Sequence, residues 1–220
     1  MNFAQNDISL IAVLAMASLM PFVIAVGTCY IKFSVVFTLV RNGLGLQQVP
    51  SNMVINALAL MLAAYVMQPI LTSIYDQYRL LGEPLNSVAS VVNFLENSLA
   101  DYKSYLGRYT DADLLGFFER ARLADGDLPS VAPAEERSLF ALIPAYALSE
   151  LKDAFRIGFY LYLPFIVVDL VVSSILLSLG MMMMSPVTIS APIKLILFVA
   201  MDGWGQLSQG LVRQYLDIPA

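Results

Sequence analysis

Histidine is absent from this sequence of 220 residues, and cysteine occurs once, at Cys29. The lack of histidine removes the commonest metal ligand and the commonest general base near neutral pH. A single cysteine excludes an intrachain disulfide and a cysteine-rich metal site. The sequence also has no GxxxxGK[ST] phosphate-binding loop and no pattern that pairs a nucleophile with a base. An enzyme is therefore the least favoured class, and we expect no cofactor and no metal.

Charge is scarce as well. Charged residues make up 13% of the chain and hydrophobic residues 59%, with a mean hydropathy of +0.73. An average globular domain has about 25% charged and roughly 45–50% apolar residues. The net charge of −5 disfavours a nucleic-acid partner. A chain of this length cannot bury so much apolar surface in a soluble core, so the composition predicts contact with a lipid membrane or with equally apolar chains.

Most of the charged residues lie between Asp76 and Arg156, and apolar blocks flank this polar centre. Three blocks are long enough to cross a hydrocarbon core of about 30 Å as a helix. They are Ile8–Ile31 with 24 residues, Met53–Tyr75 with 23 and Ile157–Gly180 with 24. A fourth block, Val187–Met201, has only 15 residues and is short for a span unless the amphipathic stretch after it extends the helix.

The predicted fold class is all-α, with membrane-type helical hairpins that contain nominally four hydrophobic helices. Residues 1–75 are expected to form an N-terminal hydrophobic hairpin. Residues 76–138 are expected to form a polar, acidic helical insert, because apolar side chains there recur at helical spacing. Residues 139–220 are expected to form a C-terminal hydrophobic hairpin with a methionine-rich turn.

Local signals suggest where helices begin and where they bend. Ser51 or Asn52 can cap the second apolar helix, and Thr110 followed by Asp113 resembles a capping box that opens a helix of the insert. Prolines inside apolar helices each free a backbone carbonyl and tend to produce a kink. These prolines are Pro21, Pro69, Pro164 and Pro192.

The distribution of basic residues suggests an orientation. The segment from Lys32 to Asn52 holds two basic and no acidic residues, and short basic loops favour the cytoplasm. The insert and both termini would then lie on the opposite side. The first residues lack a basic region and include Asp7, so we expect the first apolar block to be retained and not cleaved as a signal peptide.

Four consecutive methionines, Met181, Met182, Met183 and Met184, lie between Gly180 and Pro186. One interpretation is a flexible apolar linker or filling for a core. The other is a constriction that deforms around a passing chain, because unbranched thioether side chains pack adaptably against varied shapes.

Asp169 and Lys194 lie inside apolar blocks, where a charge is costly and usually faces a partner or water. In a hairpin that turns near Met183, the two side chains come within reach of each other. They could pair within the hairpin or between neighbouring subunits, and Lys32 is a competing partner for Asp169. A structural pair and a snorkelling side chain are the alternatives to a functional role.

Three stretches resemble the SctR/FliP family of the type III secretion export apparatus. They are RNGLGLQQVPSN at 41–52, IPAYALSEL at 143–151, and the run 155–204 with its LPF, VDL, LGMMMMSP and FVAMDGW motifs. The injectisome branch fits better than the flagellar one, whose members often carry a cleavable signal sequence. The central segment, about 76–136, departs most from the family, so we assign no functional residue there from the resemblance.

The resemblance implies a subunit of an export gate in the bacterial inner membrane, with the insert on the periplasmic side. Such subunits assemble as about five copies into a helical, cone-like pore together with SctS-type and SctT-type subunits. Unfolded secreted proteins pass through this pore. By the same resemblance, Met181 to Met184 correspond to a methionine gasket that narrows the closed pore.

Two alternatives remain open at the level of the sequence. One is a subunit of a small-solute or ion channel or transporter, with Asp169 and Lys194 lining the path. The other is a purely structural membrane scaffold. Co-purification separates a gate from a channel, because a gate subunit is expected to bring two other small hydrophobic proteins with it.

Overall fold

The computed structural model describes residues 14, 15, 17–19, 21–80, 100–122, 138–181 and 183–216. Within these ranges the chain forms helices and no strand, which confirms the all-α prediction. Two shorter helical stretches, Pro21–Gly27 and residues 100–109, accompany the six labelled helices. The labelled helices are α2 (Tyr30–Gly43), α3 (Asn52–Leu80), α5 (Ala112–Arg122), α6 (Leu139–Ser178), α7 (Pro186–Ala200) and α8 (Gly203–Arg213).

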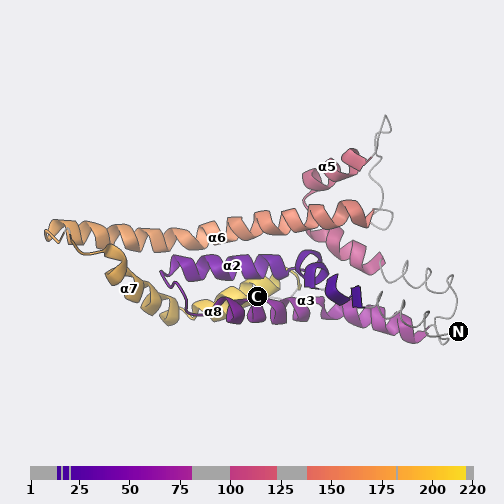
Figure 1. The fold of residues 1–220 in the computed structure, drawn as a ribbon, viewed down its shortest axis with the longest axis horizontal. Helices are drawn as coiled ribbons and strands as arrows, with labels where there is room; N and C mark the ends of the chain where they lie inside the picture. The colour runs from indigo at the N-terminus through magenta and orange to yellow at the C-terminus, as the bar shows by residue number, and fades with distance from the viewer. Residues whose placement is uncertain are drawn as a thin grey trace.

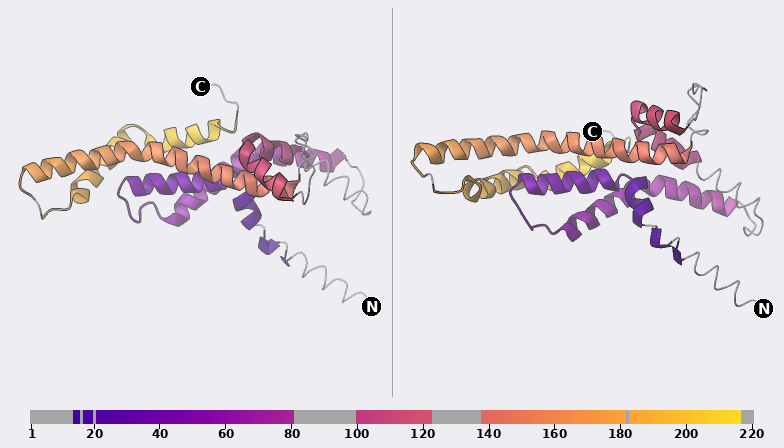
Figure 2. Two further views of the ribbon diagram at one scale, coloured as in Figure 1. Left: turned by 90° about the horizontal axis from the view of Figure 1, so that it is seen from above. Right: turned by 45° about the horizontal axis from the view of Figure 1, so that its top comes forward.

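Helix α6 runs along the long axis of the molecule and organises the other helices (Figure 1). The turn between α6 and α7 forms one end, and α5 lies near the other end (Figures 1 and 2). Helix α2 packs against both α6 and α3, and α7 folds back on α6. The main core consists of buried side chains from α2, α3, α6, α7 and α8, with Phe33, Phe37 and Val40 of α2 at its centre.

The first apolar block is bent at residues 28–29, whereas the sequence predicted one helix that tends to kink at Pro21. Residues Pro21–Gly27 and helix α2 meet at an angle of 79°, with the break at Thr28 and Cys29. Helix α2 then continues through Lys32, where the sequence suggested the end of a span, and stops only at Gly43. The charge does not end the helix because Lys32 is buried against an acidic partner. The first hairpin is therefore α2 with α3.

Helix α6 is a single helix of 40 residues. It begins at Leu139, well before the third apolar block Ile157–Gly180, and continues through most of that block. Pro164 lies inside it, and Pro69 and Pro192 lie inside α3 and α7. Helix α7 has only 15 residues and bends by 60° into α8, so the fourth block does not continue straight.

The helix ends differ in part from the predicted caps. At α5, the backbone N–H of Asp113 donates to Asp111 Oδ1 at 2.9 Å, while Thr110 Oγ1 donates backwards to the carbonyl of Leu106. The predicted capping box at Thr110 is therefore wrong, because Asp111 provides the cap. At α3, the cap is Ser51, whose Oγ lies 3.4 Å from the N–H of Val54.

Two helices of the described chain, α3 and α6, are long and apolar enough to cross a membrane. The number rises to four if each bent pair counts as one span. Their outer surfaces carry many exposed large apolar side chains, among them Met53 and Met61 on α3 and Phe159 and Leu163 on α6. A surface of this kind requires lipid or other apolar chains around it.

Candidate functional site

The turn between α6 and α7 carries the methionine run. Gly180 follows the last turn of α6 with φ +74°, a left-handed conformation that glycine adopts without steric cost. Its N–H donates to the carbonyl of Leu177, and the N–H of Met181 donates to the carbonyl of Leu176. These two bonds form a Schellman motif, which terminates α6. Pro186 then starts α7, and the described residues between the two helices, 179–181 and 183–185, are non-helical.

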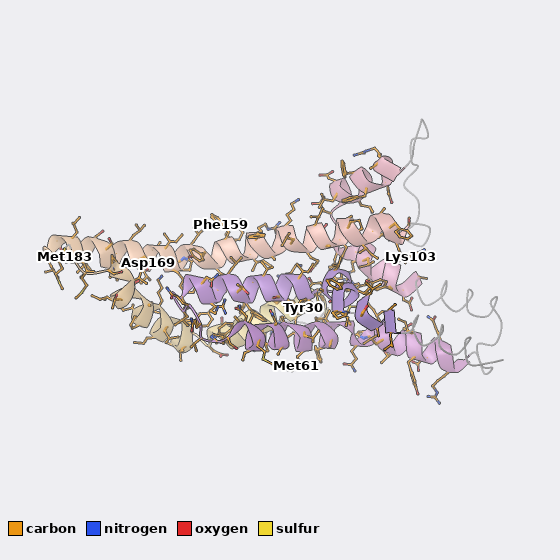
Figure 3. The ribbon with its side chains drawn as sticks, viewed as in Figure 1. Tyr30, Met61, Lys103, Phe159, Asp169 and Met183 are labelled. Carbon is orange, nitrogen blue, oxygen red and sulfur yellow. The ribbon has the colours of Figure 1, made fainter. Side chains whose placement is uncertain are left out.

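The described methionine side chains of this turn are exposed. Met183 is fully exposed, and Met181 and Met184 are also exposed, while Met182 lies outside the described residues. Figure 3 labels Met183 at the far end of the α6–α7 hairpin, with Asp169 further along α6 toward the body. The tip of the hairpin is therefore an apolar cap that nothing in the single chain covers.

Asp169 and Lys194 lie next to each other behind this tip. Lys194 Nζ lies 2.6 Å from Asp169 Oδ2, and Ser190 Oγ donates to Asp169 Oδ1 at 2.6 Å. Lys194 Nζ also donates to the carbonyl of Gly43 at 3.1 Å. A cation suits that position, because the last carbonyls of a helix such as α2 lack partners and carry partial negative charge. One lysine thus joins α2, α6 and α7.

An apolar groove lies beside this charged contact, with a volume of about 530 Å³. Its walls come from α6, α7 and α8 and include Leu161, Phe165, Phe198 and Leu211. Lys194 reaches the groove, but its side chain is only 3% exposed in the chain and is engaged by Asp169 and Gly43. The charge pair therefore holds helices together within one chain, and its lysine is not free to receive a hydrated ion.

Lys32, the competing partner considered for Asp169, lies elsewhere. Its Nζ is 3.1 Å from Glu150 Oε1 and 4.8 Å from the centre of the Tyr215 ring. Tyr215 donates its hydroxyl hydrogen bond to the other carboxylate oxygen of Glu150. Sequence reasoning did not single out Glu150 or Tyr215. The sequence gave no signal for this burial, because Glu150 lies in the charged stretch that precedes the third apolar block, close to Lys152 and Asp153.

Three tyrosines of the helical segment 100–109 contact three other parts of the chain. Tyr102 Oη donates to the carbonyl of Gly27 at 2.8 Å, and Tyr105 Oη lies 2.9 Å from Tyr146 Oη on α6. Tyr109 Oη donates to the carbonyl of Tyr215 at 3.0 Å. Burial raises the pKa of Tyr102 to about 12, so its phenol is a neutral donor at physiological pH. The sequence placed Tyr102 on the apolar face of an insert helix but gave no indication of these bonds.

The start of α5 is attached to α6 as well. Lys152 Nζ lies 2.6 Å from Asp111 Oδ2, and the N–H of Asp111 donates to Ser149 Oγ at 2.8 Å. The hydrogen bond from Lys152 is the main reason that the pKa of Asp111 lies below its usual value. The described part of the insert is therefore fastened to the helical body by polar contacts and is not a detached domain.

Comparisons with known proteins agree on one family. The model of the FliP family matches residues 13–211. The chain is 58% identical to the surface presentation of antigens protein SpaP of Shigella flexneri, over 98% of this chain and 99% of that protein. It is 44% identical to the Yop proteins translocation protein R of Yersinia pestis, over 96% and 97% of the two chains. It is 37% identical to the harpin secretion protein HrcR of Erwinia amylovora, over 98% and 100%.

Proposed function

The chain belongs to the FliP family as an injectisome-type member, and from this premise we propose that it forms part of the pore of a protein export gate. Its similarity to secretion and translocation proteins identifies it as a membrane component of a type III secretion apparatus. In the proposed gate it assembles as about five copies together with SctS-type and SctT-type subunits. Unfolded secreted proteins cross the bacterial inner membrane through this assembly.

The methionine turn is the observation that carries the pore proposal. A fully exposed Met183, held at the end of a 40-residue helix by a Schellman motif, has no role within a single chain. Several copies around an axis bring these side chains together into an apolar collar. A narrow apolar constriction excludes hydrated ions, and flexible thioether side chains re-pack around a polypeptide of any sequence.

Orientation and energy supply complete the proposal. In the proposed orientation the insert lies on the periplasmic side, as in the related export-gate subunits. Of the two basic residues that favour a cytoplasmic position, Arg41 lies in the last turn of α2 beside the loop to α3, whereas Lys32 is buried against Glu150. The loop between α2 and α3 and the segment 100–122 lie toward opposite ends of α2, in keeping with that arrangement (Figure 1). The chain acts without enzymatic activity, and other components of the apparatus supply the energy for export.

The channel alternative is not favoured by the contacts of Asp169 and Lys194. Their charges are engaged with each other, with Ser190 and with Gly43 inside one chain. The Lys194 side chain is 4% exposed, and Asp169, although 39% exposed, has both carboxylate oxygens engaged, so neither residue presents a free charge to a water-filled path.

Native mass spectrometry of the complex, extracted from the membrane in mild detergent, tests the proposal directly. The expected result is a particle with several copies of this chain and at least two other small hydrophobic proteins. A monomer, or an assembly of this chain alone that still supports secretion, would contradict the proposed gate.

A further inference from the structure

Two side-chain hydrogen bonds support the break between residues 21–27 and α2. Both are accepted by backbone carbonyls of helix 21–27. Thr28 Oγ1 donates to the carbonyl of Ile24 at 2.6 Å, and Tyr102 Oη donates to the carbonyl of Gly27 at 2.8 Å. A bend of 79° removes helical partners from such carbonyls, and a buried carbonyl without a partner is costly. Gly27 is buried, so its carbonyl depends on the donor from Tyr102.

A side chain at position 27 would clash with the hydroxyl oxygen of Tyr102 but not with its ring. A Cβ atom added to Gly27 would lie 2.3 Å from Tyr102 Oη but 3.6 Å from Cζ. The first distance is too short for any real contact, and the second is normal van der Waals contact. Glycine is therefore needed at position 27 because of one oxygen atom, which lies 75 residues away in sequence.

The segment that carries Tyr102 is itself fixed in place. Tyr105 and Tyr109, one and two turns further along, are hydrogen-bonded to Tyr146 on α6 and to the carbonyl of Tyr215 after α8. Leu106 between them is completely buried in a cluster that includes Leu142 of α6. The Tyr102 hydroxyl is thus a fixed point relative to the helical body, which is what a positioning group requires.

The helix 21–27, on the N-terminal side of the break, is exposed and apolar. Phe22 is 69% exposed and Val23 60%, and Figure 2 shows residues 21–27 leaving α2 at a steep angle. Residues 21–24 are all exposed in the described structure, so the direction of this helix relative to the body is set mainly at the break.

We propose that Tyr102 is a positioning residue, which sets the direction of the N-terminal helix 21–27 through its hydrogen bond to the carbonyl of Gly27. In this way the insert controls how that apolar helix is presented to its surroundings. The inference goes beyond the pore proposal and does not depend on it, because it concerns the geometry of one chain.

The test is a distance measurement by electron–electron resonance in the purified complex. Spin labels are placed at Leu19→Cys and Ser104→Cys, and labelled chains are diluted with unlabelled copies so that distances within one chain dominate. Cys29 is fully buried and stays in place. Tyr102→Phe is expected to at least double the width of the distance distribution, because it removes only the hydroxyl. Tyr75→Phe, which alters an exposed tyrosine on α3, is the matched control and should leave the distribution unchanged.

A double-mutant cycle with Gly27→Ala separates positioning from general destabilisation. In the parent protein, Gly27→Ala should shift or widen the distribution, since its Cβ meets Tyr102 Oη. In the Tyr102→Phe background the oxygen is gone, and the same alanine should add no further change. If Tyr102→Phe fails to accumulate, Gly27→Ala alone gives the same readout. An unchanged distribution in the Tyr102→Phe or Gly27→Ala protein, or additive effects in the cycle, would overturn the proposal.

Discussion

Lys32 on α2 and Glu150 on α6 form an ion pair inside the protein, with Nζ and Oε1 3.1 Å apart and both side chains at most 4% exposed. The carboxylate also accepts a hydrogen bond from Tyr215, whose ring lies under the ammonium group. The pair therefore connects α2, α6 and the segment after α8. Loss of one partner of a buried pair leaves an uncompensated charge in an apolar surrounding, which is more costly than loss of both.

Lys32→Met is expected to destabilise the protein strongly, by about 3–5 kcal/mol, because Glu150 then remains buried without its counter-charge. The double variant Lys32→Met with Glu150→Gln should recover most of the loss. Thermal unfolding of the purified complex, followed with its yield from membranes, measures both effects. Lys152→Met is the matched control, since this lysine is 62% exposed in its own ion pair and exposed pairs contribute little. Equal losses for Lys32→Met and Lys152→Met would contradict the role of the buried pair.

Asp169→Ala should reduce the amount of assembled complex several-fold, because Lys194 is left buried and without its carboxylate. Exchange of the two charges, Asp169→Lys with Lys194→Asp, should not rescue assembly. The new aspartate would face the carbonyl of Gly43, which the native lysine neutralises. Blue native electrophoresis of membrane extracts quantifies the complex. Normal assembly and secretion with both Asp169→Ala and Lys194→Ala would show that the contact is dispensable.

Replacement of Met182, Met183 and Met184 by alanine should leave assembly largely intact and raise ion leakage through the closed gate. The reason is that shorter side chains widen an apolar constriction and allow it to wet. Membrane conductance, in cells that express the variant with its partner subunits, is the measurement.

Leu179→Ala with Val187→Ala is a suitable control for the methionine variant. Both residues flank the turn and are exposed, so the change removes apolar surface without altering the methionines. An assembled triple variant that stays as impermeable as the parent would rule out the gasket and leave the linker interpretation.

Cysteines in the insert and in the loop between α2 and α3 should react from opposite sides of the membrane. Phe117→Cys on α5 is exposed in the insert, and Gln48→Cys is exposed in the loop between α2 and α3. In a Cys29→Ala background, an impermeant thiol reagent added from outside should label Cys at position 117 and spare position 48. The reverse pattern would mean that the insert faces the cytoplasm.

The long, uniform features of the fold could be predicted from the sequence. The second half of α6 follows from the apolar block Ile157–Gly180, and the end of the hairpin follows from Gly180 and Pro186 on either side of the methionines. These are local signals, since each depends on neighbouring residues and the rules for helix ends. The proximity of Asp169 to Lys194 also followed from hairpin geometry, because the turn fixes which residues lie opposite each other.

The features that depend on distant contacts could not be predicted. The bend at Thr28 has no proline within the break, and the donor that stabilises it, Tyr102, comes from the insert. Lys32 looked like the end of a span, because a charge in an apolar region normally lies at the water boundary. Its burial depends on Glu150, more than a hundred residues away in sequence.

The uninterrupted course of α6 limits how this protein can sit in a bilayer. Forty residues at about 1.5 Å per residue give a rod of about 60 Å, twice the thickness of a hydrocarbon core of about 30 Å. Only a tilt of about 60° would contain the whole rod, and transmembrane helices tilt by 0–40°. Where α6 crosses a bilayer within that range of tilt, between about a third and a half of it extends past the lipid tails, yet its sides remain rich in aromatic and aliphatic groups from Phe140 to Leu177. Along that part, neighbouring proteins must take the place of lipid as the apolar surroundings.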